Sequence, residues 1–129
     1  MSTSEAITQG IQIRVQSEYL EQESSPDNKQ YVFAYHVTLI NQSDETVQLI
    51  SRHWIINNAD GKKEEVKGMG VIGQQPVIPP GETFTYSSFC PLETPVGSMY
   101  GTYQMLNEDG EEFDAKIAPF TLAVPGILQ

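Results

Sequence analysis

Residues 66–81 read V-K-G-M-G-V-I-G-Q-Q-P-V-I-P-P-G, and this stretch decides which fold class the chain can adopt. Three of its four glycines have the spacing G-x-G-x-x-G: Gly68, Gly70 and Gly73. In dinucleotide-binding proteins that spacing joins a buried parallel strand to a helix, whose N-terminus holds the pyrophosphate. Here three prolines follow within residues 76–80, and proline removes an amide donor and clashes inside a helix. The preceding residues 62–67 are mostly charged, whereas a central parallel strand is nearly all apolar. The stretch therefore predicts a folded loop between two strands and excludes a dinucleotide fold.

The glycine loop leaves two roles open. Glycine reaches backbone angles closed to other residues, so the loop is either an ordered bend or a nest of N–H groups that binds an anion. Four of the seven basic residues lie shortly before it, which makes this segment slightly positive in a chain of net charge -10. The candidate recognition or anion site comprises Arg52, Lys67, Gly68, Gly70 and Gly73. We favour a structural and recognition role, with phosphate or pyrophosphate binding as the alternative.

Length and composition limit the other classes of function. A chain of 129 residues makes one domain, which we place at residues 10–129 after a flexible polar tail at residues 1–9. Net charge -10 argues against nucleic acid and against an anionic membrane surface as partners. One cysteine excludes an internal disulfide and suits a reducing compartment. Because the N-terminus lacks the pattern of a signal peptide, we expect a cytoplasmic protein.

Alternating apolar and polar residues predict short strands and no helix. The strands are expected at residues 11–16, 31–40, 46–57, 62–67, 83–89, 98–106, 111–117 and 120–124. Turn residues separate them every eight to twelve positions, with Asp60-Gly61 and Asp109-Gly110 as the strongest hairpin signals. This pattern is typical of an all-β protein, an antiparallel β-sandwich of the immunoglobulin-like or fibronectin type III-like kind, with a closed barrel as the alternative. Trp54 lies on a strongly apolar strand and should be largely buried.

Candidate catalytic and metal-binding residues do not combine into a site. His36 and His53 are the only histidines, and their spacing does not supply the convergent ligands that a metal needs. Cys90 has no basic neighbour in sequence to activate it and is expected to be a buried free thiol. The tyrosines exceed what one core face needs, so some of them either reach an interface or pack with their hydroxyls at the rim. We predict no catalytic residues, no metal site and no cofactor.

Several motifs together resemble those of the ApaG family of small bacterial proteins. They are S-R-H-W-I-I at 51–56, G-M-G-V-I-G-Q-Q-P at 68–76, E-T-P-V-G at 93–97 and F-T-L-A-V-P at 120–125. The resemblance implies a fibronectin type III-like sandwich that works as a protein-binding module. It also implies an association with cobalt resistance and magnesium efflux, in which a soluble chain would be an accessory factor. The sequence departs from the family pattern at Met69, Phe89 and Gln129.

The expected function is therefore that of a non-enzymatic module that binds a protein partner of unknown identity. A small-ligand binder that holds a phosphate group at the glycine loop is the first alternative, and a role in metal homeostasis is the second. Self-association into a homodimer stays open as well.

Overall fold

The computed structural model describes residues 2–127, which form nine strands and two short 3-10 helices. The strands in chain order are β1 (Ser2–Thr8), β2 (Ile11–Tyr19), β3 (Tyr31–Asn41), β4 (Val47–Asn58), β5 (Lys63–Met69), β6 (Val77–Ile78), β7 (Thr83–Leu92), β8 (Val96–Leu106) and β9 (Glu112–Ala123). The 3-10 helices η1 (Glu21–Glu23) and η2 (Pro26–Asn28) lie between β2 and β3. The predicted all-β class is confirmed. Gln129, one of the departures from the family pattern, lies outside the described residues.

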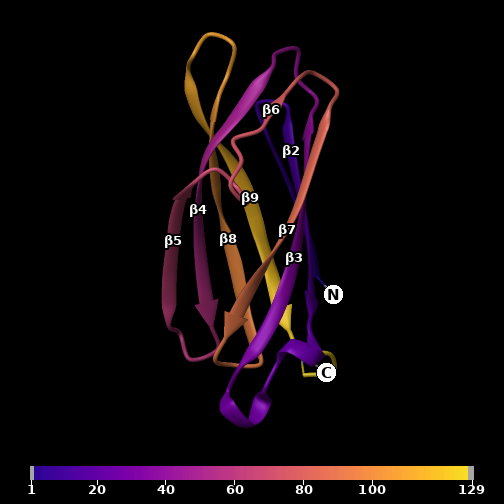
Figure 1. The fold of residues 1–129 in the computed structure, drawn as a ribbon, viewed down its shortest axis with the longest axis vertical. Coiled ribbons are helices and arrows are strands. Elements are labelled where there is room, and N and C mark those ends of the chain that lie inside the picture. The colour runs from indigo at the N-terminus through magenta and orange to yellow at the C-terminus, as the bar shows by residue number, and fades with distance from the viewer. Residues whose placement is uncertain (1, 128–129) are drawn as a thin grey trace.

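The strands form two antiparallel sheets packed face to face (Figure 1). The first sheet has the order β1-β2-β3-β7, and the second has the order β5-β4-β8-β9, with β6 paired to β4 beyond the end of β5. All pairings are antiparallel, and hairpins join β1 to β2, β4 to β5 and β8 to β9. The chain is thus an antiparallel β-sandwich rather than a closed barrel, because no ladder joins the two sheets within residues 2–127.

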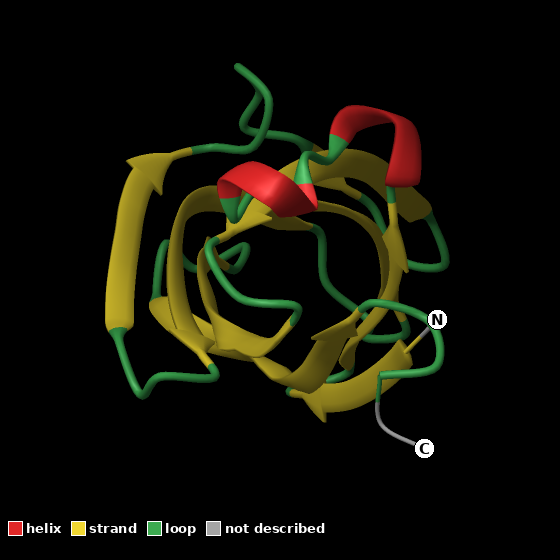
Figure 2. Cartoon of the chain, turned by 90° about the horizontal axis from the view of Figure 1, so that it is seen from below, coloured by secondary structure: helices red, strands yellow, loops and turns green. Residues whose placement is uncertain are grey.

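The two sheets close against each other on one side only. The backbone N–H groups of Lys116 and Thr121 on β9 donate to the hydroxyl oxygens of Thr8 and Ser2 on β1, each at 3.0 Å. The hydroxyl of Ser17 on β2 donates to the carbonyl of Thr121 at 2.8 Å. Viewed along the strands, the two sheets curve around a common interior (Figure 2). The opposite side, between the edge strands β5 and β7, carries no such bonds among the described residues, and we call it the open side.

The first residues of the chain are not a tail. Residues 2–8 form β1, which pairs with β2 along its whole length, from Ser2 opposite Ser17 to Thr8 opposite Ile11. The prediction of a flexible segment at residues 1–9 is therefore wrong for the described part. The segment is polar, so its sequence gives no apolar alternation, yet its hydroxyls satisfy the backbone of a strand more than a hundred positions away.

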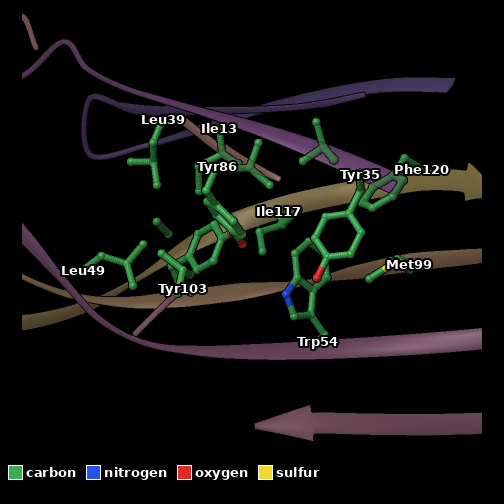
Figure 3. Close-up of a cluster of buried hydrophobic side chains, with 14 of the residues drawn as sticks. Ile13, Tyr35, Leu39, Leu49, Trp54, Tyr86, Met99, Tyr103, Ile117 and Phe120 are labelled. Carbon is green, nitrogen blue, oxygen red and sulfur yellow. The ribbon is translucent and has the colours of Figure 1, made fainter. Parts of the chain in front are cut away.

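The core consists of the inward-facing side chains of both sheets (Figure 3). Trp54 lies at its centre with 2% of its surface exposed, which confirms the prediction of burial. Its ring meets those of Tyr35, Tyr103 and Phe120 edge-on, with centroid separations of 5.2, 6.1 and 5.9 Å. Edge-to-face contacts suit the charge distribution of aromatic rings and add to the burial of their surface.

Two predicted strands at the C-terminus are one. β9 runs through Pro119, and its register against β8 shifts between Met99 and Gly101. Ala118 and Pro119 there stand opposite the single residue Tyr100, which is a β-bulge. A proline is tolerated in such a bulge because no partner needs its missing N–H.

Within residues 2–127, no helix is long and apolar enough to cross a membrane.

Candidate functional site

The glycine loop, residues 70–76, turns the chain from β5 to β6 at one end of the open side. The N–H of Gly70 donates to the carbonyl of Ile50 at 2.7 Å. The N–H groups of Val71 and Gln74 each donate to the other residue's carbonyl, at 2.8 and 2.9 Å. Because these three amides are used within the protein, they do not point together at an external anion. The loop is an ordered bend, and binding of a phosphate group at it stays a prediction.

Two of the glycines lie at close approaches, of which the one at Gly70 is to backbone atoms. Gly70 has φ 64°, and a Cβ at this position would overlap the carbonyl oxygen of Gln74. Gly68 lies beneath the guanidinium of Arg52, whose Nη2 would be 2.7 Å from an added Cβ. The spacing that resembles a nucleotide motif thus has a structural cause, since one glycine closes the loop and another accommodates an arginine.

The five candidate site residues do not converge. Arg52 points into the sandwich on the same face of β4 as Trp54, and its Nη1 donates to the carbonyls of Gly70 at 2.8 Å and Met69 at 3.3 Å. Lys67 pairs with His53, one position along the ladder, so its side chain leaves the opposite face of the sheet. Gly73 lies at the loop tip with no neighbour near its Cα. Arg52, Gly68 and Gly70 are therefore in contact, Lys67 meets Arg52 and Gly68 only in the lining of a shallow outer hollow, and Gly73 lies apart.

A cleft of about 680 Å³ opens between β5 and β7. Its inner wall includes Tyr35 and Trp54 from facing sheets, and Arg52, Ser88 and Cys90 lie around them. Its outer wall includes Phe89 of β7 and Val66 of β5. Sequence reasoning missed this cleft because its walls come from four separate parts of the chain. One signal in the sequence was available. Arg52 and Trp54 are two positions apart on one strand, so a buried Trp54 places the charged side chain of Arg52 on the inward face as well.

Beside the inner end of the cleft lies a group of three tyrosines. Tyr35, Tyr86 and Tyr103 are buried, with exposures of 7%, 7% and 0%, and the hydroxyls of Tyr86 and Tyr103 are hydrogen-bonded to each other. Burial raises the pKa of all three phenols, and the positive charge of Arg52 opposes this increase. These tyrosines belong to the core, so the surplus of tyrosine in the sequence is mostly a buried cluster and not an exposed patch.

The tyrosines predict a loss of stability at alkaline pH. A phenol whose pKa is raised in the folded state keeps its proton after the unfolded chain has released its own near pH 10. The stability that these groups provide is therefore complete below about pH 9 and falls as the pH rises above about 10. Urea unfolding at pH 7 to 11.5 should show a flat region followed by a decline, and Tyr86→Phe should make that decline shallower. A stability that stays level to pH 11.5 would contradict the assignment.

The histidines lie on opposite outer faces of the sandwich. His36 on β3 contacts the hydroxyl of Ser87 through Nδ1 at 2.6 Å, with Glu18 at 3.8 Å from its Nε2. His53 on β4 lies 3.5 Å from a carboxylate oxygen of Glu65. The two sheets separate these side chains, so His36 and His53 cannot share one metal ion. Within residues 2–127, no three metal-ligating side chains gather.

Cys90 is a buried free thiol, as its apolar neighbours predicted. Burial raises its pKa to about 12, and the negative charge of Glu64 adds to the increase. A thiol with so high a pKa carries almost no thiolate at neutral pH and is a poor nucleophile. In the wall of the cleft, the Cys90 side chain therefore contributes apolar surface and not a reactive group.

Exposed apolar side chains concentrate on the open side. Five of the seven large hydrophobic residues exposed among the described residues belong to β5, the glycine loop, β6 and β7: Val66, Met69, Ile72, Val77 and Phe89. Met69 and Phe89 are 69% and 67% exposed; Phe89 lines the cleft, whereas Met69 follows Lys67 on the outer face of β5. Water-exposed apolar patches next to a concave surface are a property of binding surfaces. The other two, Ile7 and Ile127, lie elsewhere.

The fold and the site define an antiparallel β-sandwich with a cleft of mixed apolar and charged lining on its one open side. A family profile described as the ApaG domain matches residues 21–107. Protein ApaG of Anaeromyxobacter dehalogenans is 53% identical over 125 residues, which cover 97% of this chain and 98% of that protein. Protein ApaG of Pseudomonas putida (strain KT2440) is 52% identical over 118 residues, or 92% and 94% of the two chains. The chain therefore belongs to the ApaG family.

Solved structures support the same assignment. The crystal structure titled as an ApaA protein of Bordetella pertussis superposes with a TM-score of 0.88 at 47% identity. The match covers 90% of this chain and 94% of that one. The family resemblance seen in the four sequence motifs is thereby confirmed.

Proposed function

We propose that this chain is a non-enzymatic protein-binding module whose partner docks on the open side of the sandwich. The observation that carries the proposal is the concentration of exposed apolar side chains on β5, the glycine loop, β6 and β7, with Val66 and Phe89 in the wall of the cleft. An exposed aromatic or methionine side chain removes much apolar surface from water when a partner covers it, and both residue types are enriched at interfaces. Phe89 and Met69 are therefore the side chains that would contribute most to binding.

The arrangement of polar groups supports binding rather than turnover. The charged side chain of Arg52 in the inner wall of the cleft is held by two backbone carbonyls. The one thiol there has a raised pKa. The histidines lie outside the cleft, so neither is placed to move a proton in it. These groups can line a surface for recognition, and no pair of them forms a nucleophile and its base.

Affinity capture with matched variants tests the proposal. The wild-type chain, a Met69→Ser/Phe89→Ser variant and an Ile7→Ser variant are immobilised and exposed to lysate. Ile7 is a fair control because it is 61% exposed and lies on β1, away from the open side. We expect one protein to be retained in stoichiometric amount by the wild type and by Ile7→Ser, and at least about tenfold less by the double variant, the loss of about 1.4 kcal/mol of binding.

Two outcomes would refute the proposal. One is that no protein is retained above the level of an unrelated acidic control chain. The other is that Ile7→Ser loses the retained protein as fully as the double variant does. Melting temperatures of all three chains show that each is folded before capture.

A further inference from the structure

The four sheet edges of this sandwich are protected very unequally. β1 and β9 are closed against each other by the hydroxyl contacts of Ser2 and Thr8. β5 carries four charged side chains in seven residues, which discourage another strand from pairing with it. β7 has neither protection, since residues 83–90 read T-F-T-Y-S-S-F-C with no charge, no proline and no glycine. It is also regular, because its ladder with β3 contains no bulge.

The hydrogen-bond register shows which backbone groups of β7 face outward. The N–H of Asn41 donates to the carbonyl of Glu82, so Ile40 and Thr83 form a non-hydrogen-bonded pair in the ladder. In an antiparallel ladder such pairs alternate with hydrogen-bonded ones. The backbone N–H and C=O groups at the alternate positions of β7 therefore point away from β3, toward the free edge. These positions are Thr83, Thr85, Ser87 and Phe89.

The hydrogen bonds around Pro91, at the other end of β7, are consistent with this register. Val32, the partner of Pro91, uses its own carbonyl to accept from the N–H of Leu20, and its N–H donates to the hydroxyl of Ser24. Val32 therefore offers nothing to β7, and Pro91 occupies a position where a backbone N–H would point to the free edge. A proline is tolerated at this position for that reason.

We propose that the free edge of β7 binds an extended segment of a partner protein, which adds a fifth strand to the first sheet. This inference rests on the proposed function and gives it a mode of recognition. Backbone hydrogen bonds to Thr85, Ser87 and Phe89 supply the affinity, and the side chain of Phe89 together with the cleft beside it selects the partner's side chains. Figure 1 shows β7 crossing in front of the second sheet, and the order of the first sheet leaves β7 paired on one side only.

The charges select the chemistry of that segment. Glu82 precedes β7, and Asn41 donates to the backbone carbonyls of Glu82 and of Glu45 in the neighbouring turn, so the chain positions of two acidic residues lie close together at the Thr83 end. The whole chain carries net charge -10. The segment that fits is uncharged and rich in β-branched residues along β7, with lysine or arginine at the Thr83 end. A second copy of this chain would bring another charge of -10 to the edge and fits less well.

A proline substitution separates edge pairing from ordinary surface contact. Thr85→Pro removes an outward N–H and adds a ring to the free edge, while the ladder to β3 needs no bond at that position. Thr85→Ala removes the same side chain and keeps the N–H. Both variants should melt within a few degrees of the wild type. The probe is a phage-displayed library of randomised twelve-residue peptides, selected on the wild-type chain at low salt.

We expect enriched peptides that combine a β-branched run with lysine or arginine at one end. A synthetic peptide made from one of them should bind Thr85→Ala within about twofold of the wild type and Thr85→Pro at least about tenfold more weakly. Hydrogen exchange should show that the peptide protects the amides of Thr85, Ser87 and Phe89. Binding should weaken as salt is raised, because opposite charges are screened.

Other results would overturn the inference. They are a library that yields no enriched peptide, peptides that bind Thr85→Pro as well as the wild type, and a wild-type dimer that Thr85→Pro abolishes in sedimentation. If a protein is still captured through Met69 and Phe89 while Thr85→Pro has no effect, the edge-pairing inference fails and the proposed function stands. If no protein is captured at all, the proposed function fails first.

Discussion

Replacement of Trp54 by alanine is expected to lower the free energy of unfolding by about 3–5 kcal/mol. The side chain is 2% exposed and touches the rings of Tyr35, Tyr103 and Phe120 from both sheets. Its removal leaves a cavity between two rigid sheets, which cannot collapse to fill it. Because a domain of this size is stable by only about 5–15 kcal/mol, the loss is a large fraction of the total.

Urea unfolding followed by far-ultraviolet circular dichroism measures the effect. Trp54→Phe keeps a ring in the site and should cost clearly less than Trp54→Ala. In the wild type the single tryptophan should emit at the short wavelengths of an indole shielded from water. Emission typical of fully hydrated indole would show that Trp54 does not lie at the centre of the core. A decrease of less than about 1 kcal/mol in the free energy of unfolding for Trp54→Ala would show the same.

The second large effect is expected from Gly101→Ala. Gly101 lies on β8 against β4, and an added Cβ would overlap the carbonyl oxygen of His53 and lie 3.1 Å from the Cα of Trp54. Both obstacles are backbone atoms of a central strand, so the two strands would have to move apart and lengthen their hydrogen bonds. We expect a loss of about 3 kcal/mol or more, at the upper end of overpacking effects.

Gly110→Ala is the matched control for this substitution. Gly110 lies in the β8–β9 turn with φ 75°, and no atom lies within 4 Å of an added Cβ. Its replacement should cost only the strain of a left-handed backbone, about 1–2 kcal/mol. Gly101 has no left-handed backbone, so a loss at Gly101→Ala no larger than that at Gly110→Ala would mean that β8 does not approach β4 as closely as the structure shows.

The sequence was enough to predict the strands that form the core and to exclude a dinucleotide-binding fold. Residues 31–41 and 47–58 are rich in β-branched and aromatic residues, and the prolines after the glycine string forbid the helix that a nucleotide would need. The burial of Trp54 and Cys90 followed from their neighbours in the same strands. These features are local, because each depends on residues within a few positions of one another.

Features that depend on distant residues were not predictable in this way. β1 is polar, and it becomes a strand through its pairing with β2 and its hydroxyl contacts to β9. The cleft forms only when β4, β5 and β7 are brought together. The lack of charge in residues 83–90 is visible in the sequence, yet it acquires meaning only once β7 is known to be an edge strand. Arg52 and Lys67 looked like one site because they are close in number, and the register of β4 and β5 sends them to opposite faces.

Amide hydrogen exchange of the chain, alone and with the protein that it captures, tests most directly whether the open side is the binding surface. The account predicts slower exchange within residues 66–92, greatest at the outward amides of β7, and unchanged exchange in β1 and β9. Protection confined to β1, β2 or β9, or no change in exchange anywhere while the partner is bound, would contradict it.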